Sequence, residues 1–306
     1  MNFTRRQLIR ISAATGMVAA GTFSLGGLAS ASARKWFLPY TSWLNLTDPS
    51  LGGNKTVVNN AFNQGTTWFM TGYRGPHTPS PIPPGYKGVG VLGFKAYQNG
   101  SNGLADAVRN GLPSWVQAVQ YDSEHWSWTP EKEQGAWLYN KHVNFSYAKH
   151  FCELAHSKGL KVVLTPGNDL CNNAPNSAYP NHDPQYPVQH GESIEHAYVR
   201  HGIATAAKWL SPGDVYEYQA QPLELAPSTY KSMTSEVANQ VRKQKPGVTF
   251  LAGIGRVGAT WDHASAYQLH AAASSVSKIV AGFWPNVDAN ATRVHRMIGL
   301  LRKLGY

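Results

Sequence analysis

The chain has 306 residues, of which 42% are hydrophobic, and a formal net charge of +10 from 27 lysines and arginines against 17 acidic residues. This composition excludes a disordered or collagen-like protein, and two cysteines are too few for a disulfide-stapled scaffold. The basic residues are scattered rather than clustered, so we expect no nucleic acid partner.

Residues 1–33 form a predicted export leader. The segment Thr4–Arg10 contains Arg5 and Arg6 and resembles the twin-arginine export signal, and an apolar run rich in Ala, Gly and Ser follows it. Small residues around Ala31 and Ala33 are typical of signal peptidase cleavage sites. We therefore expect residues 1–33 to be removed and residues 34–306 to form one domain that is secreted or otherwise extracytoplasmic.

Removal of the three leader arginines lowers the formal net charge from +10 to +7. A positive surface outside the cytoplasm favours association with anionic cell-wall polymers or acidic polysaccharides. No later segment approaches 18 consecutive apolar residues, so we expect no stable membrane insertion after cleavage.

Apolar runs bounded by turn residues predict eight β-strands. In chain order they are Lys35–Trp43, Thr66–Gly72, Val89–Tyr97, Trp115–Glu124, Lys161–Pro166, Val215–Ala220, Thr249–Ile254 and Lys278–Trp284. Helical periodicity fills most gaps between them, at Thr56–Asn63, Gly103–Asn110, Pro130–His156, Ile194–Leu210, Pro227–Lys243, Thr260–Ser275 and Ala289–Leu304. Strand and helix therefore alternate along the mature chain.

This alternation predicts an α/β fold, a (β/α)8 TIM-like barrel made of parallel strands. The segment Gly75–Gly88 is rich in proline and does not form a helix, which leaves open a barrel that is imperfect in its N-terminal third. An open doubly wound sheet is the alternative architecture.

Two acids lie at the end of the fourth predicted strand. Side chains alternate along a strand, so Asp122 and Glu124 share one face, at the end where (β/α)8 barrels hold their active sites. Neighbouring carboxyl groups in a low dielectric separate into a proton donor and a charged partner, which makes the two acids candidate catalytic residues. Tyr121 and Trp126 beside them are candidate sugar-binding aromatics. A turn cap and a surface ion pair are the alternative roles for the acids.

Other candidate binding residues lie in or just after three later strands. Asn168 and Asp169 come after the fifth strand, with a loop turn as their alternative role. Alternation in the sixth strand puts Glu217, Gln219 and Gln221 on one face, where buried amides need partners. Trp284 and Asn286 share one side of the eighth strand, where an indole suits a sugar ring and a core position is the alternative.

Cys152 is predicted on a helix and Cys171 just after the next strand, which are neighbouring elements. An oxidising compartment permits a disulfide between them, and two buried unpaired thiols are the alternative. His190, His196 and His201 lack the spacing of a zinc helix, and the glycines from Gly253 to Gly258 match a dinucleotide fingerprint without its later acid. We therefore expect no cofactor and no metal.

The segment Gln117–Glu124 is similar to the Asp-x-x-Asp-x-Asp-x-Glu signature of family 18 glycoside hydrolases, the chitinase-like barrels, which carry it on the fourth strand. The last two acids of the signature match. The resemblance implies that Glu124 is the general acid and that Asp122 orients a substrate acetamido group as internal nucleophile. Gln117 and Gln120 stand where the family has acids.

The family also lines its site with a Trp from the eighth strand, which Trp284 resembles. The sequence thus predicts a glycoside-hydrolase-like protein acting on a polysaccharide or glycoconjugate, and 25 Trp and Tyr residues against 10 Phe suit a carbohydrate ligand. A non-catalytic carbohydrate-binding barrel is the second hypothesis. A metal-dependent phosphodiesterase barrel is the third.

Overall fold

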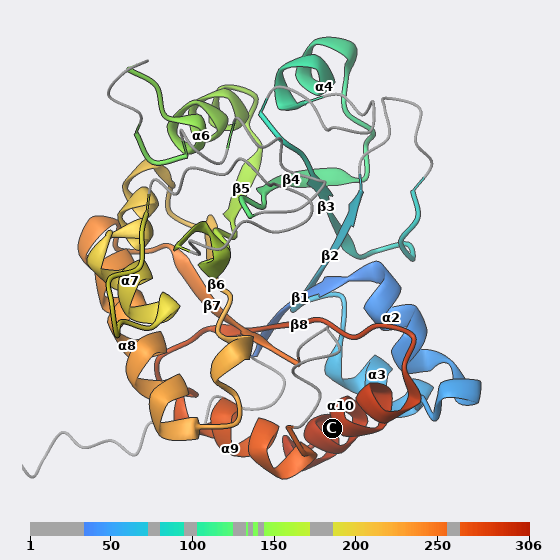
Figure 1. The fold of residues 1–306 in the computed structure, drawn as a ribbon. Helices are drawn as coiled ribbons and strands as arrows, with labels where there is room; N and C mark the ends of the chain where they lie inside the picture. Colours follow the sequence, from blue (N-terminus) through green and yellow to red (C-terminus); the bar gives the residue numbers. More distant parts are fainter. Residues whose placement is uncertain are drawn as a thin grey trace, which may run out of the picture.

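The computed structural model describes residues 34–72, 80–94, 103–124, 133, 137–139, 144–171, 186–255 and 264–306. Within these residues the chain forms a closed ring of parallel strands with helices around it (Figure 1). The predicted leader and Trp126 lie outside the described residues.

Eight parallel strands close into a barrel in chain order, and β8 pairs with β1. The strands are β1 Lys35–Pro39, β2 Thr67–Gly72, β3 Lys87–Val91, β4 Val116–Tyr121, β5 Lys161–Leu164, β6 Val215–Tyr218, β7 Thr249–Ile254 and β8 Gly282–Pro285. The predicted (β/α)8 barrel is confirmed, and β1 to β4 pair in sequence, while no helix lies between β2 and β3 among the described residues. Closure between β1 and β8 excludes the open sheet.

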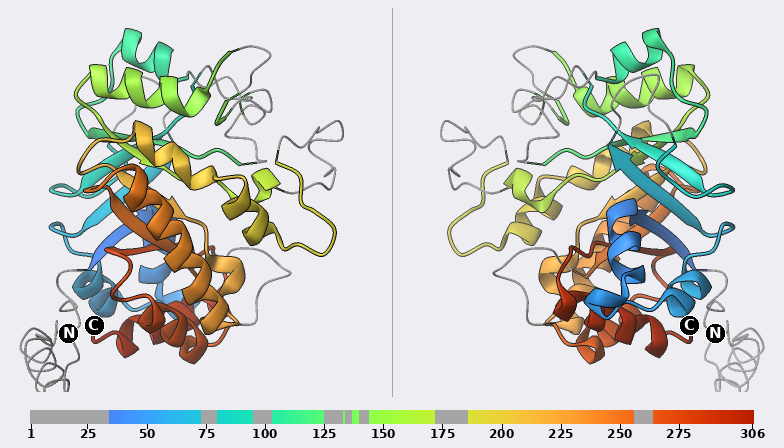
Figure 2. Two further views of the ribbon diagram at one scale, coloured as in Figure 1. Left: turned by 90° about the vertical axis from the view of Figure 1, so that its left-hand side faces the viewer. Right: turned by 90° about the vertical axis from the view of Figure 1, so that its right-hand side faces the viewer.

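Helices cover the outside of the strands in both side views (Figure 2). The α-helices are α2 Tyr40–Thr47, α3 Lys55–Ala61, α4 Leu104–Asn110, α6 Tyr147–Ser157, α7 Ile194–Arg200, α8 Pro227–Gln244, α9 Ala266–Ser275 and α10 Ala291–Lys303. Short 3-10 helices are η2 Pro49–Leu51, η3 Asn168–Cys171, η4 Ile203–Trp209 and η5 Gln221–Leu223.

Several segments differ from the sequence prediction; in the helix predicted over Pro130–His156, for example, residues 137–139 and 144–146 are not helical. The first predicted strand stops at Pro39, and the residues after it are helical, with Tyr40 and Trp43 stacked one turn apart at a ring-centroid distance of 5.8 Å. The helix predicted over 194–210 is divided at Gly202, whose φ of 66° is left-handed and separates α7 from η4.

The strand register arranges the inward side chains in layers. Met70 of β2 pairs with Val89 of β3, and Val89 pairs with Ala118 of β4. Gln120 lies two residues after Ala118 on the same face of β4. The same step, two strands across and two residues along, leads from Gln120 to Glu217 and from Glu217 to Trp284. With the β1–β8 register extended by one residue, it leads from Trp284 back to Met70. Because each pair of strands advances by two residues, one turn advances by eight, the shear of a (β/α)8 barrel.

The layers change from apolar to polar along the barrel axis. Beneath the layer that contains Met70, Gln120, Glu217 and Trp284 lies an apolar layer of Phe37, Val89, Val163 and Leu251. Continued alternation places Asp122, Gln219 and Asn286 together at the carboxyl ends of the strands. An apolar floor therefore supports a polar mouth.

The outward side chains of the strands form a second, larger core with the helices. Trp36 meets Phe62 edge-on at a ring-centroid distance of 5.0 Å, and Tyr121 stacks on Phe151 at 4.8 Å. In the part of the chain that the structure describes, no helix combines the length and the apolar character needed to cross a bilayer.

The predicted disulfide is not formed. Cys152 in α6 and Cys171 at the end of η3 are both free and buried. Burial raises the pKa of both thiols, to about 12 for Cys171, so both stay protonated. They pack as small apolar side chains, which is the alternative that the sequence left open.

A buried carboxylate joins the amino-terminal ends of β5 and β6. Asp214 is fully buried, and its Oδ1 accepts a hydrogen bond from the Val162 backbone N–H at 3.0 Å. Its Oδ2 accepts from the Ser211 backbone N–H at 2.6 Å and contacts His156 Nε2 at 2.7 Å. Three groups from separate elements therefore depend on one side chain.

Replacement of Asp214 by Asn should lower the free energy of unfolding by about 3 kcal/mol, because an amide N–H would replace an oxygen that faces two donors. Urea unfolding at an unchanged m-value measures this loss. The control, Asp106→Asn, removes a surface pair with Arg109 and should cost less than about 1 kcal/mol. Equal losses in both variants would contradict the role given to Asp214.

Candidate active site

The two acids after β4 point to the inside of the barrel mouth. Asp122 continues the inward row that contains Ala118 and Gln120, and its side chain is only 1% exposed. Glu124 is the next member of that row and is partly exposed. Glu124 therefore lies nearer to solvent, and Asp122 lies beneath it.

Gln219, which follows β6, joins the two acids. Its Nε2 donates a hydrogen bond to Asp122 Oδ1 at 3.4 Å and to Glu124 Oε2 at 3.1 Å. Because one nitrogen contacts both oxygens, these oxygens are no farther apart than the sum of the two distances. The structure thus brings together three residues that alternation had placed on the inward faces of two strands, while their roles stay predictions.

A third carboxyl group lies beside Glu124. A methyl group added at Gly167 would lie 2.5 Å from Asp169 Oδ1 and 2.6 Å from Glu124 Cβ. The Gly167 backbone N–H also donates to the Ser123 carbonyl oxygen at 2.8 Å, which fixes the chain after β5 against the chain after β4. Glycine at this position lets Asp169 approach the acid pair.

Burial and mutual repulsion keep protons on the acid pair. Burial raises the pKa of Asp122, the charge of Asp169 raises it further, and a hydrogen bond from Thr165 opposes both effects. Burial also raises the pKa of Glu124 well above its usual range, with added repulsion from Asp122 and Asp169. The hydrogen bond from Gln219 acts in the opposite direction on Glu124. A carboxylic acid that stays protonated near neutral pH is suited to donate a proton.

A fourth acid, Glu217, lies in the layer below Asp122. Its side chain is fully buried, and neither carboxyl oxygen has a hydrogen-bond partner among the described residues. Burial raises the pKa of Glu217 well above its usual range, and the charge of Asp122 adds to the effect. Glu217 is therefore held in its neutral form.

The remaining predicted binding residues divide by depth. Gln221 and Asn286 are partly exposed at the mouth, and the Gln221 amide lies against Gly253, where an added methyl group would be 2.3 Å away. Asn168 is buried and donates from Nδ2 to the Gln219 carbonyl oxygen at 2.9 Å. Asn168 therefore positions Gln219, and its predicted contact with a sugar stays a prediction.

Two predicted sugar-binding aromatics are core residues. Tyr121 faces the helices, is fully buried, and donates from its hydroxyl to Glu133 Oε2 at 3.0 Å, so the predicted ligand contact is wrong. Trp284 is 5% exposed inside the barrel, with its ring 6.4 Å from the Phe37 ring between centroids. Trp284 lies in the layer that also contains Met70 and Glu217, below the mouth, and offers no exposed face for a sugar ring. Alternation predicted that the side chain points inward, but not how deep it lies.

Sequence reasoning missed Thr165 and Gly167. Thr165 Oγ1 accepts a hydrogen bond from Gln120 Nε2 at 2.9 Å and also interacts with Asp122. The only available signal was their position at the carboxyl end of the fifth predicted strand. A small side chain at that position carries no chemical pattern of its own.

The histidines noted in the sequence have local structural roles. His196 Nδ1 contacts Ser193 Oγ at 3.1 Å at the start of α7, and His201 Nε2 contacts the Pro187 carbonyl oxygen at 2.9 Å. Among the residues that the structure describes, no group of three or more His, Cys, Asp and Glu side chains is arranged to hold a metal ion.

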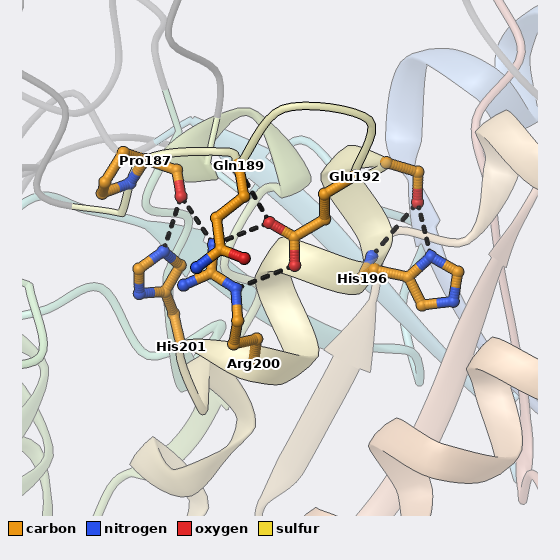
Figure 3. A network of polar contacts seen from close by, with 7 residues as sticks. Pro187, Gln189, Glu192, His196, Arg200 and His201 are labelled. Atoms are coloured by element: carbon orange, nitrogen blue, oxygen red, sulfur yellow. Dashed lines mark hydrogen bonds and ion pairs between the residues drawn. The ribbon is translucent and has the colours of Figure 1, made fainter.

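The same region contains an ion pair that fixes α7 (Figure 3). Arg200 donates from Nε and Nη2 to the two carboxylate oxygens of Glu192, at 2.8 and 2.7 Å, and these bonds lower the pKa of Glu192 to about 2. Since α7 packs against η3, this network supports the element that carries Asn168 and Asp169.

Comparisons with known proteins show no family for this chain. No family model and no curated protein matches the sequence. One similar solved structure is a GH128 subgroup III curdlan-specific exo-β-1,3-glucanase from Blastomyces gilchristii in complex with glucose. It is 11% identical, with 87% of this chain and 97% of that chain covered and a TM-score of 0.44.

Two other similar structures have different activities. The carboxyl transferase domain of Rhizobium etli pyruvate carboxylase is 9% identical, with 89% of this chain and 47% of that chain covered and a TM-score of 0.40. A glucosidase from Croceicoccus marinus is 13% identical, with 77% and 60% covered and a TM-score of 0.37. With TM-scores below 0.5, these likenesses assign neither a family nor an activity to the chain.

Replacement of Gln219 by Leu should raise the pKa of Glu124 further, because the hydrogen bond that favours its charged form is lost. Carbon NMR titration of labelled glutamate carboxyl groups measures the shift. Gln221→Leu is the matched control, since the Gln221 amide lies over Gly253. A pKa of Glu124 that falls or does not move in the Gln219 variant contradicts the geometry.

Replacement of Glu217 by Gln should make stability less dependent on pH. The folded-state pKa of Glu217 is raised, so the unfolded chain releases this proton first and wild-type stability falls as pH rises above the usual carboxyl range. One such group contributes a slope of about 1.4 kcal/mol per pH unit between its two pKa values. The difference between the unfolding free energies at pH 4.5 and pH 8 should be smaller in the variant than in wild type. An unchanged difference would contradict a buried neutral Glu217.

Proposed function

We propose that the protein is a glycoside-hydrolase-like enzyme that cleaves a polysaccharide or glycoconjugate by carboxylate acid/base catalysis. The main support is the acid pair Asp122 and Glu124, joined by Gln219 at the carboxyl ends of β4 and β6. Enzymes with this barrel place their catalytic groups at that end. Glu124 is the proton donor because it is the more exposed of two acids that burial keeps protonated.

The spacing of the pair favours one class of glycosidase mechanism. Inverting enzymes separate their two carboxyl groups by about 6.5 Å or more to admit a water molecule, and retaining enzymes use a shorter spacing. Two contacts of 3.4 and 3.1 Å from Gln219 Nε2 keep the Asp122 and Glu124 oxygens at or below that limit. This upper bound is compatible with the shorter spacing of retaining enzymes, and retention is the outcome that we propose.

In the proposed reaction Glu124 transfers its proton to the glycosidic oxygen while the bond from that oxygen to the anomeric carbon breaks. Asp122, in the fraction of molecules in which it has lost its own proton, attacks that carbon or orients a substrate acetamido group that does so, and a water molecule that gives its proton to Glu124 then releases the sugar. Asp169, beside Glu124, stabilises the positive charge that develops on the sugar ring. The amides of Gln221 and Asn286 are available for sugar hydroxyls at the mouth.

The proposal includes a location outside the cytoplasm. It rests on the leader-like residues 1–33, with their Arg5-Arg6 pair, and on the positive charge of the mature chain, which suits anionic cell-wall polymers. Detection of the processed chain in a culture supernatant, and its loss when Arg5 and Arg6 are replaced by Lys, tests this part independently of catalysis.

Glu124→Gln should reduce hydrolysis of natural glycans by about 10²- to 10⁴-fold, because a poor leaving group needs the donated proton. The loss should be smaller for an aryl glycoside whose leaving group needs no proton. Rates on a panel of polysaccharides and on the aryl glycoside measure both effects. Glu236→Gln, on the exposed face of α8, is the control and should act like wild type.

Other outcomes identify the competing functions. A wild type that binds glycans and hydrolyses none of the panel supports the non-catalytic carbohydrate-binding barrel. Activity on a phosphodiester that a chelator abolishes supports the phosphodiesterase. Glycan hydrolysis that survives Glu124→Gln at full rate overturns the proposed proton donor.

A further inference from the structure

A groove of about 430 Å³ lies on the outer wall of the barrel, away from the acid pair. The first half of α6, the chain just before it and the end of η4 form its walls, and α6 packs against η4. Its volume is within the range of sites that bind small molecules or a few sugar rings. None of its lining residues belongs to the candidate active site.

Two aromatic side chains line this groove. Tyr139 is 57% exposed, and its hydroxyl donates to Asn144 Oδ1 at 2.8 Å, which fixes the direction of the ring. Asn144 has a left-handed φ of 47°, a conformation that Asn adopts more readily than most residues. Trp209, partly exposed, lines the groove from η4. Flat aromatic faces of this kind suit the apolar faces of sugar rings.

Two exposed lysines add positive charge. Lys149 comes from α6, and Lys208 comes from η4, where its Nζ lies 4.8 Å from the centroid of the Trp209 ring. Glu153 lies next to the groove, with its carboxylate 3.4 Å from Lys149 Nζ and 3.3 Å from His150 Nδ1. One acid against two lysines leaves the groove with a net positive charge, so it complements an anionic ligand.

We propose that this groove binds an acidic polysaccharide, with a sugar ring against Tyr139 and Trp209 and the sugar carboxylate near Lys149 and Lys208. This site is separate from the proposed catalytic function and does not depend on it. It would hold the protein on a uronate-containing polymer while the barrel mouth remains open to substrate.

The test measures binding of the full chain to polygalacturonate by affinity electrophoresis at low and high salt. Lys149→Gln combined with Lys208→Gln, and separately Tyr139→Ala, should each weaken binding by about tenfold, which corresponds to about 1.4 kcal/mol. Wild-type binding should weaken as salt rises.

Matched controls separate the groove from general surface properties. Lys231→Gln combined with Lys243→Gln removes the same charge from exposed positions on α8, and Tyr267→Ala removes another exposed tyrosine with a lysine at its ring. Both controls should bind like wild type. Equal loss in the lysine control, equally tight binding of a neutral glucan, or tighter binding of a single-stranded oligonucleotide at the groove would each overturn the proposal.

The experiment also distinguishes this proposal from the catalytic one. Glu124→Gln should bind polygalacturonate as wild type does, since Glu124 is not part of the groove. Loss of hydrolysis with binding intact supports both proposals. Hydrolysis that persists in Glu124→Gln refutes only the proton donor, and binding that survives all groove variants refutes only the groove.

Discussion

The closed register of the eight strands is the constraint on which the candidate site depends. Each two-strand step advances an inward layer by two residues, so Gln219 just after β6 lies level with Asp122 just after β4, and the Gln219 amide contacts the acid pair. A one-residue slip in either strand would turn these side chains toward the helices, because alternate residues face opposite sides. The site is thus a consequence of closure as much as of residue type.

The second determinant is the medium around each carboxyl group. Glu217 sits above an apolar layer without hydrogen bonds from the described residues, and burial raises its pKa. Glu192 is on the surface with two bonds from Arg200, and its pKa falls to about 2. A glutamate is therefore neutral inside the barrel and charged at position 192, just before α7, because the two side chains lie in different surroundings.

The sequence was sufficient for features that depend on periodicity. Alternation identified the inward rows that contain Asp122 and Glu217, and strand–helix repetition identified the barrel. It was not sufficient for depth, because alternation does not say how far below the mouth a residue such as Trp284 lies. It also missed contacts between distant loops, such as the bond from Asn168 to the Gln219 backbone, since these depend on three-dimensional packing.

The pairing of β1 with β8 joins segments about 250 residues apart, and contacts of such long range form slowly. The two backbones touch closely there, since a methyl group on Gly282 would lie 1.8 Å from the Lys35 carbonyl oxygen. The barrel can close only after the ribosome has synthesised β8. An N-terminal fragment that lacks β8 therefore cannot form the closed barrel during synthesis. The export that we propose suits such a chain, since the twin-arginine signal that residues 1–33 resemble belongs to a route that accepts folded cargo.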